Sequence, residues 1–235
     1  MAEFQLNTAH LYADLMNTYG DYGNLVALRY YAKQLGVRFE TTTVSIGDEF
    51  DANAYDFVLF GGGQDYEEQV VSADLPTKAA NIKKYIEADG PFLGVCGGFQ
   101  LLGEYFLLAD GTRVEGISAM HHYTLNQPHG RFTGNVQIKN EETGQIYKGF
   151  ENHQGRTFIA SDERPLGTVL HGNGNNGEDG SEGLIYRNVF GTYFHGPILT
   201  RNGNLALRIL KIALERKYPN VDWSTKISAI EPENF

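Results

Sequence analysis

The chain has 235 residues, 41% of them hydrophobic and 28 of them glycine, and a formal net charge of −10. This composition predicts one folded, turn-rich α/β domain over residues 1–235 and excludes a disordered chain. The acidic balance argues against a surface for nucleic acid or anionic membrane. No apolar run reaches the ~20 residues that span a bilayer. The first residues lack a signal-peptide pattern and one cysteine permits no internal disulfide, so we expect a cytoplasmic protein.

The N-terminal half alternates apolar strands with helical patterns. In chain order, we expect strands at 4–11, 37–44, 55–60 and 91–95. A helix is predicted from Tyr22 to Leu35, and Ala79, Ile82 and Ile86 mark the apolar face of another helix. The alternation of strands and helices predicts a mostly parallel sheet with helices on both faces.

The second half is less regular. Its expected strands are 131–139, 156–160, 166–170 and 189–194, and a final helix presents Leu207, Leu210 and Leu214 on one face. The glycine- and asparagine-rich run from His171 to Gly180 predicts a loop. Two interpretations of this loop stay open, a surface loop without a role and a contact with a partner.

The single cysteine, Cys96, follows the strand 91–95 and has glycines two residues before and two residues after it. A strand that turns sharply through glycines into a helix holds a nucleophile above a sheet. The helix expected from Gly98 to Leu108 would point its amides at Cys96 and favour the thiolate. The alternative is that Cys96 is a small buried hydrophobic residue.

Two further features come at the carboxyl ends of predicted strands. Gly61–Gly63 follows the strand 55–60, and His195 follows the strand 189–194. Because ligands bind at this edge of a parallel sheet, we expect both features to meet Cys96 there. His195 would then serve as the base for Cys96, while the backbone amides of Gly97, Gly62 and Gly63 would form an oxyanion hole.

These motifs resemble a known family. The elbow Gly-Val-Cys-Gly-Gly-Phe-Gln-Leu-Leu-Gly, the upstream Phe-Gly-Gly-Gly-Gln-Asp and the strand-terminal histidine are similar to class I glutamine amidotransferases, which have a flavodoxin-like fold. His195 is followed by Gly-Pro and not by the usual His-x-Glu, as in the branch related to cobyric acid synthase. The runs 11–24, 150–157 and 174–179 resemble the glutaminase subunits of lipid II isoglutaminyl synthases.

The resemblance implies a division of labour between two subunits. This chain would hydrolyse L-glutamine through a Cys96 thioester, with Arg131 holding the substrate. A Mur-ligase-like partner, MurT, would form a heterodimer with it and use ATP and Mg to amidate the D-glutamate of lipid II in peptidoglycan synthesis. No cofactor or metal is implied for this chain, and the absence of any Gly-Lys pair excludes a Walker A motif. Contact with lipid II would place the complex at the inner membrane face.

Other interpretations stay open at this point. The chain could supply ammonia for another acid, such as a cobyric acid precursor, act alone as a DJ-1-like cysteine hydrolase, or be a regulator without activity. A metal site at His121, His122 and His129 is a further alternative. The acid missing after His195 would come from the partner, or from Glu151 or Asp179 of this chain.

Overall fold

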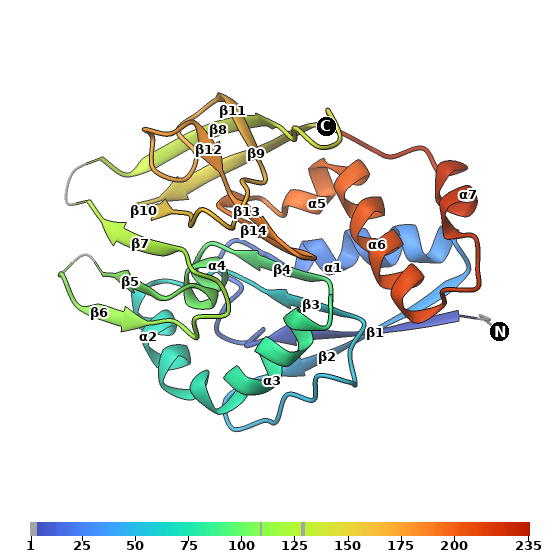
Figure 1. Cartoon of the computed structure of the whole chain (residues 1–235), viewed down its shortest axis with the longest axis horizontal. Coiled ribbons are helices and arrows are strands. Elements are labelled where there is room, and N and C mark those ends of the chain that lie inside the picture. The colour runs from blue at the N-terminus through green and yellow to red at the C-terminus, as the bar shows by residue number, and fades with distance from the viewer. Residues whose placement is uncertain (1–3, 109, 128–129) are drawn as a thin grey trace.

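A six-stranded sheet forms the centre of the protein (Figure 1). The computed structural model describes residues 4–108, 110–127 and 130–235. In spatial order, the strands of this sheet are β13 (Leu184–Tyr186), β14 (Val189–Thr192), β4 (Phe92–Val95), β3 (Phe57–Phe60), β1 (Phe4–Leu11) and β2 (Val37–Val44). Neighbouring strands are parallel except at the β13–β14 edge. All residues of β3 and β4 are buried, as expected for inner strands covered on both faces.

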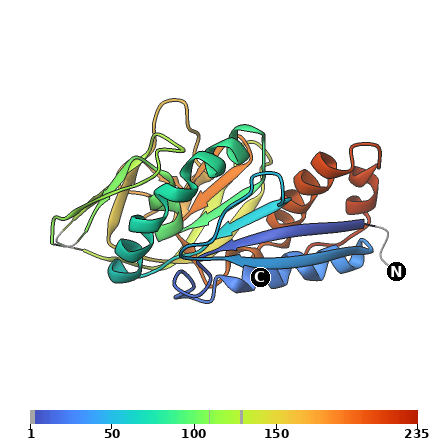
Figure 2. The ribbon, with the colours of Figure 1, turned by 90° about the horizontal axis from the view of Figure 1, so that it is seen from below.

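Helices cover both faces of the sheet (Figure 2). They are α1 (Tyr22–Gln34), α2 (Asp65–Asp74), α3 (Pro76–Glu87), α4 (Gly97–Leu102), α5 (Ile198–Arg201), α6 (Gly203–Lys217) and α7 (Trp223–Ser228). α1 packs with α5 and α6 on one face, while α2 and α3 lie on the other. Within the described residues, no helix combines the length and apolar character that crossing a bilayer requires.

Two smaller sheets adjoin the large sheet, one past the carboxyl ends of its strands and the other beyond its β13–β14 edge (Figure 1). One has the order β10 (Gly155–Phe158), β7 (Tyr123–Asn126), β5 (Tyr105–Leu107) and β6 (Arg113–Glu115). The other has the order β12 (Ser181–Glu182), β11 (Gly167–His171), β8 (Phe132–Lys139), β9 (Ile146–His153) and β15 (Phe194–His195). Both sheets matter for function because loops and strand ends from them form one wall of the cavity described below.

The predicted α/β fold with a mostly parallel sheet is confirmed, but two elements near the site differ. The helix expected from Gly98 to Leu108 ends at Leu102, and the chain then enters β5. The strand expected over 189–194 is interrupted at Tyr193, where the chain leaves the large sheet and joins β9 through β15. The periodicity of a short apolar run could not reveal where the helix ends or where the strand is interrupted, because both depend on contacts with distant strands.

Glu182 stabilises the point where the chain changes sheets. Its Oε1 accepts hydrogen bonds from Thr192 Oγ1 at 3.0 Å and from the backbone N of Tyr193 at 2.8 Å. Burial raises the pKa of the Glu182 carboxyl group to about 8, so it stays protonated at neutral pH. The folded structure of the segment that leads to His195 therefore contains the protonated carboxyl group of Glu182.

Unfolding free energy is expected to fall as the pH rises from 6.5 to 8. Folded Glu182 keeps a proton that the unfolded chain, with its ordinary pKa of 4.5, has already lost, so this stabilisation is greatest at low pH and disappears as the pH approaches 8. His10, His153 and His195, whose pKa values are lowered in the folded chain, oppose this trend near pH 6.5, and their effect fades by about pH 7.5 as the unfolded histidines lose their protons. Each such carboxyl group contributes a slope of about 1 kcal/mol per pH unit. Denaturant unfolding measured at several pH values should show that the unfolding free energy of Glu182→Gln falls less steeply with pH than that of the wild type. An equally steep fall would contradict the assignment of the raised pKa to Glu182.

Candidate active site

Cys96 lies at a strained turn between β4 and α4. Its backbone has φ 49° and ψ −110°, an uncommon conformation for a residue with a Cβ. Gly98 lets the turn approach β3 closely, because a Cβ at that position would overlap the carbonyl oxygens of Phe60 and Gly61. The backbone N of Gly98 donates to the Gly61 oxygen at 3.0 Å. The turn thus has the geometry of a nucleophile elbow.

The thiol of Cys96 is protonated in this conformation. Burial raises its pKa most, and the carboxyl groups of Glu68 and Asp21 raise it further. A hydrogen bond from the Gly97 amide and the charge of Arg131 lower the pKa, with smaller effects. The expectation that a helix N-terminus favours the thiolate is therefore wrong for this state, since burial outweighs the amides of α4, which has only six residues.

His195 leaves the same end of the sheet as Cys96. Thr192 of β14 pairs with Val95 of β4, and the backbone N of Cys96 donates to the Thr192 oxygen at 2.9 Å. Burial, assisted by the charge of Arg131, lowers the pKa of His195 to about 4, so its imidazole is neutral at neutral pH. Both ring nitrogens are buried without a hydrogen-bond partner among the described residues.

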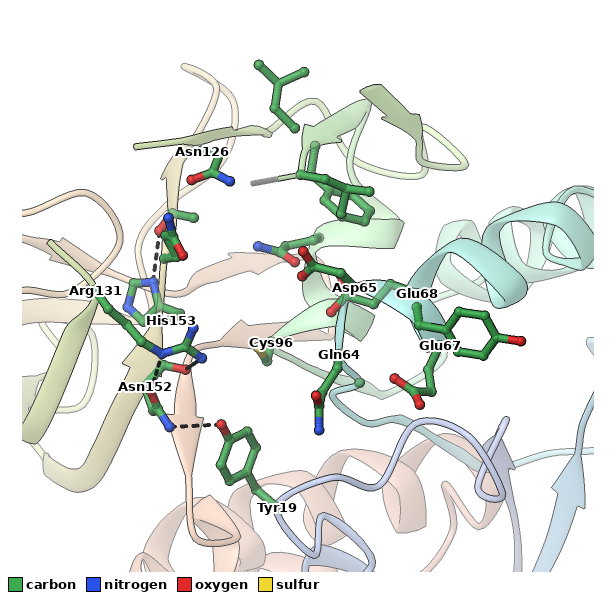
Figure 3. Close-up of a pocket in the computed structure, with 18 residues that line it drawn as sticks. Tyr19, Gln64, Asp65, Glu67, Glu68, Cys96, Asn126, Arg131, Asn152 and His153 are labelled. Carbon is green, nitrogen blue, oxygen red and sulfur yellow. Dashed lines mark hydrogen bonds between the residues drawn. The ribbon is translucent and has the colours of Figure 1, made fainter. Parts of the chain in front are cut away.

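A chain of contacts connects Arg131 to His195, and Figure 3 shows the part from Arg131 through Asn152 to Tyr19. Arg131 Nε donates to Asn152 Oδ1 at 2.5 Å, and Asn152 Nδ2 donates to the Tyr19 hydroxyl group at 2.8 Å. The Tyr19 ring packs on the imidazole of His195, with ring centroids 4.1 Å apart. Arg131 itself forms no ion pair within the described part of the chain, so its outer nitrogens can receive a carboxylate.

Arg131, Asn152 and Tyr19, but not His195, line a cavity of about 560 Å³ that reaches Cys96 (Figure 3). Arg131, Asn152 and His153 lie on one side of Cys96. Three acidic residues from the first turns of α2 lie on the other side, namely Asp65, Glu67 and Glu68. The cavity thus presents opposite charges on its two walls, a pattern suited to a small zwitterion.

The glycines expected in the oxyanion hole are not equally available. The Gly62 amide donates to Asp21 Oδ2 at 2.8 Å, and burial raises the pKa of Asp21 to about 6. Gly63 lines the cavity, and the Gly97 amide faces the sulfur of Cys96. In this conformation the structure therefore differs from the expectation for Gly62, whose amide already has an acceptor, and leaves Gly63 and Gly97 as candidates.

Neither internal acid considered for His195 is free to reach it. Glu151 accepts hydrogen bonds from the backbone N of Asn173 at 3.0 Å and of Gly174 at 3.0 Å. Asp179 accepts from Asn176 Nδ2 at 2.6 Å and from the backbone N of Ser181 at 2.8 Å. Both carboxylates therefore shape the loop that follows β11.

The histidines considered for metal binding have other neighbours. His121 Nδ1 lies 3.0 Å from an Asp162 oxygen, and His122 Nε2 lies 2.9 Å from the Phe99 oxygen. His129 lies outside the described residues. Among the residues with described positions, no three His, Cys, Asp or Glu side chains gather as metal ligands.

Several residues in or next to the cavity were not identified from the sequence. Tyr19 and Asp21 fall in the run 11–24, and Asn152 and His153 in the run 150–157, so the family resemblance was the available signal for them. Glu68 gave no signal, because a glutamate in the first turns of a helix is ordinarily a solvated residue that favours the helix dipole.

Comparison with known proteins identifies the family. The CobB/CobQ-like glutamine amidotransferase domain family matches residues 7–203. The GatD subunit of lipid II isoglutaminyl synthase (glutamine-hydrolyzing) from Streptococcus pneumoniae is 55% identical over 215 residues, covering 92% of this chain and 83% of that protein. The GatD subunit from Staphylococcus aureus is 38% identical over 213 residues, covering 91% and 86%.

More distant relatives agree with this result. The probable cobyric acid synthase of Methanothermobacter thermautotrophicus is 31% identical over 180 residues, which cover 71% of this chain but only 34% of that protein. A crystal structure of a glutamine amidotransferase superposes with a TM-score of 0.58 and 14% identity, covering 87% of this chain and 98% of that one, and supports the fold alone. The chain therefore belongs to the CobB/CobQ-like glutamine amidotransferase family, in the branch that contains the GatD subunits.

Proposed function

We propose that the protein is the glutaminase subunit of a lipid II isoglutaminyl synthase and releases ammonia from L-glutamine for peptidoglycan synthesis. The cavity carries this proposal, because it places the single cysteine at a strained elbow opposite an arginine without an ion-pair partner among the described residues. The identity with the GatD subunits over 92% of the chain supports the choice of reaction and acceptor.

The proposed reaction forms and then hydrolyses a thioester. His195 takes the proton of the Cys96 thiol, and the sulfur attacks the side-chain amide carbon of glutamine. The C=O electron pair of this side-chain amide moves to its oxygen, and the backbone amides of Gly97 and Gly63 stabilise the resulting oxyanion. When the C–N bond breaks, His195 returns the proton to nitrogen and ammonia departs. His195 then activates the water molecule that hydrolyses the γ-glutamyl thioester.

Arg131 is proposed to bind the α-carboxylate of glutamine. A guanidinium group can hold a carboxylate through two hydrogen bonds, and Asn152 fixes the orientation of Arg131. Asp65 and Glu67 on the other wall offer acceptors for the α-ammonium group of the same substrate. This arrangement favours glutamine over amides that lack its charged end.

A Mur-ligase-like partner, MurT, is proposed to complete the enzyme as a heterodimer. The partner would bind ATP and Mg, activate the α-carboxylate of D-glutamate in lipid II and receive the ammonia. The ring nitrogens of His195 have no hydrogen-bond partner among the described residues. This supports the proposal that a carboxylate of the ligase subunit binds the His195 ring. Docking of the ligase would then orient His195 and couple glutamine hydrolysis to amide synthesis.

The test is ammonia release from glutamine by the chain alone and by the chain co-expressed with the Mur-ligase-like subunit, with and without lipid II and ATP. We expect slow release by the chain alone, faster release by the complex, and amidated lipid II only with the complex. Mass spectrometry of acid-quenched samples should detect a γ-glutamyl group on Cys96. Equal rates of ammonia release with and without the ligase would contradict the proposal that the ligase supplies the carboxylate for His195.

The specificity of the same complex tests the role of Arg131. 4-Aminobutanamide, which keeps the amide but lacks the α-carboxylate, should be a poorer substrate than glutamine by about 100-fold in kcat/KM, as expected for loss of a charged hydrogen-bonded pair. Arg131→Met should remove most of this discrimination. If the variant still discriminates as the wild type does, another group binds the carboxylate.

A further inference from the structure

Glu68 has an unusual position for a glutamate. It belongs to the first turns of α2, yet its side chain is 4% exposed and lines the cavity beside Cys96 (Figure 3). No hydrogen bond to its carboxyl group occurs among the described residues. Its carboxyl oxygens are not among the buried polar atoms that lack a partner, so they open to the cavity, where a ligand beside Cys96 can use them.

The Glu68 carboxyl group lies against the proposed oxyanion hole. A Cβ built on Gly97 would overlap Glu68 Oε1, so only a glycine at position 97 leaves room for this carboxyl group. The amide of Gly97 is a proposed donor to the oxyanion. The other side of the hole is weaker than expected, because Asp21 occupies the Gly62 amide. Glu68 is therefore placed where it can add a donor to the amides of Gly97 and Gly63.

Electrostatics decides which form of Glu68 is present. Burial, then the charges of Asp65 and Glu67, raise the pKa of Glu68 to about 8, so its carboxyl group is neutral at pH 7. A neutral carboxyl group has an O–H that donates a hydrogen bond. An ionised Glu68 would instead repel both the thiolate and the oxyanion at Cys96.

We propose that Glu68 is a further catalytic residue, whose neutral carboxyl group donates a hydrogen bond to the oxyanion formed when Cys96 attacks glutamine. In this step an S–C bond forms and the carbonyl electron pair moves to oxygen, while Glu68 keeps its proton and shares it with that oxygen. When the carbonyl group reforms, the C–N bond breaks and ammonia leaves with the proton from His195. The inference rests on the proposed glutaminase reaction.

Two substitutions in the full complex test whether the Glu68 side chain acts as a hydrogen-bond donor or as a negative charge. Glu68→Met keeps the length of the side chain but has no donor, so kcat should fall by about 100-fold with KM changed less than about 3-fold. Glu68→Gln restores an N–H donor and should recover kcat to within about 5-fold of the wild type. Thermal unfolding of each variant checks that the fold is intact, and alkylation of Cys96 checks access to the cavity.

The pH profile gives a second, independent readout. The groups that face Glu68 are Asp65 and Glu67 on its own helix, with Cys96 and Arg131 across the cavity. Wild-type kcat should fall as the pH rises above 8, when Glu68 loses its proton, and Glu68→Gln should lack this loss. Glu182→Gln is the matched control, because it removes the other buried carboxyl group with a pKa of about 8 and should keep the loss.

The outcomes distinguish this role from its alternatives. If Glu68→Gln is as slow as Glu68→Met, or if Glu68→Met is as fast as the wild type, Glu68 is not an oxyanion donor. A rise in KM without a fall in kcat in both variants would instead assign Glu68 to binding the α-ammonium group. If the wild-type complex forms no thioester with glutamine, the proposed function fails, whatever the Glu68 variants show.

Discussion

Replacing Cys96 by serine is expected to lower glutaminase turnover of the complex by about 10⁴-fold or more, the scale seen when a nucleophile is removed from a catalytic group that acts as a unit. The serine hydroxyl group is a far weaker acid than the thiol, which is already held protonated mainly by burial. The γ-glutamyl adduct should disappear from the quenched mass spectrum. Ammonia release and the adduct should be lost together.

The controls use the fact that Cys96 is the only cysteine of the chain. On this chain a thiol-directed reagent therefore reports on this residue alone, and any label on the Cys96→Ser chain would reveal a side reaction. ATP-dependent amidation supplied with free ammonia should survive in the Cys96→Ser complex, because the ligase reaction does not use the thiol. Loss of both activities would mean that the substitution damages the complex. Turnover within about 100-fold of wild type would remove Cys96 from the mechanism.

Local sequence patterns predicted the strand before Cys96 and the turn at Cys96, but not the length of the helix that follows. The strand 91–95 and the glycines around Cys96 imply a sharp turn whatever the rest of the fold does, and Gly98 indeed approaches the carbonyl oxygens of β3. The order of strands and helices then placed His195 at the same end of the sheet. These features depend on backbone geometry, which short motifs specify.

The electrostatics of the site could not be predicted in the same way. Asp21 reaches Gly62 across 41 positions of sequence, and Glu68 turns inward from a helix that the sequence did not reveal. Periodicity shows which residues face a core but not which acidic side chain is buried in it. The pKa of Cys96 depends on these two carboxyl groups and on burial, so the expected thiolate was replaced by a thiol.

The opposing pKa values of Cys96 and His195 imply that the resting chain is poorly active. Burial keeps the thiol protonated and also lowers the pKa of His195 to about 4, so transfer of the proton between them is unfavourable. A carboxylate brought near His195 by the ligase would raise the pKa of the imidazole and favour the transfer. This shift gives a physical reason why docking of the partner should control glutamine hydrolysis.

His195→Gln is the second large effect, with an expected fall of about 10³-fold in turnover, the range attributed to general acid–base catalysis. Glutamine keeps polar atoms in the buried pocket but cannot exchange a proton with the thiol. Single-turnover measurements should show slow thioester formation and slow hydrolysis of whatever thioester forms, because His195 serves both steps. A variant that acylates normally would restrict His195 to the hydrolytic step.

Two comparisons decide whether His195 acts together with Cys96. The double variant Cys96→Ser with His195→Gln should be no slower than Cys96→Ser alone, since the imidazole has no role once the nucleophile is gone. His153→Gln tests the other buried histidine beside Arg131, whose Nδ1 already lies 2.8 Å from the Gly155 oxygen. The fall in turnover caused by His153→Gln should be smaller than the fall caused by His195→Gln. The reverse order would identify His153, and not His195, as the base that accepts the proton of Cys96.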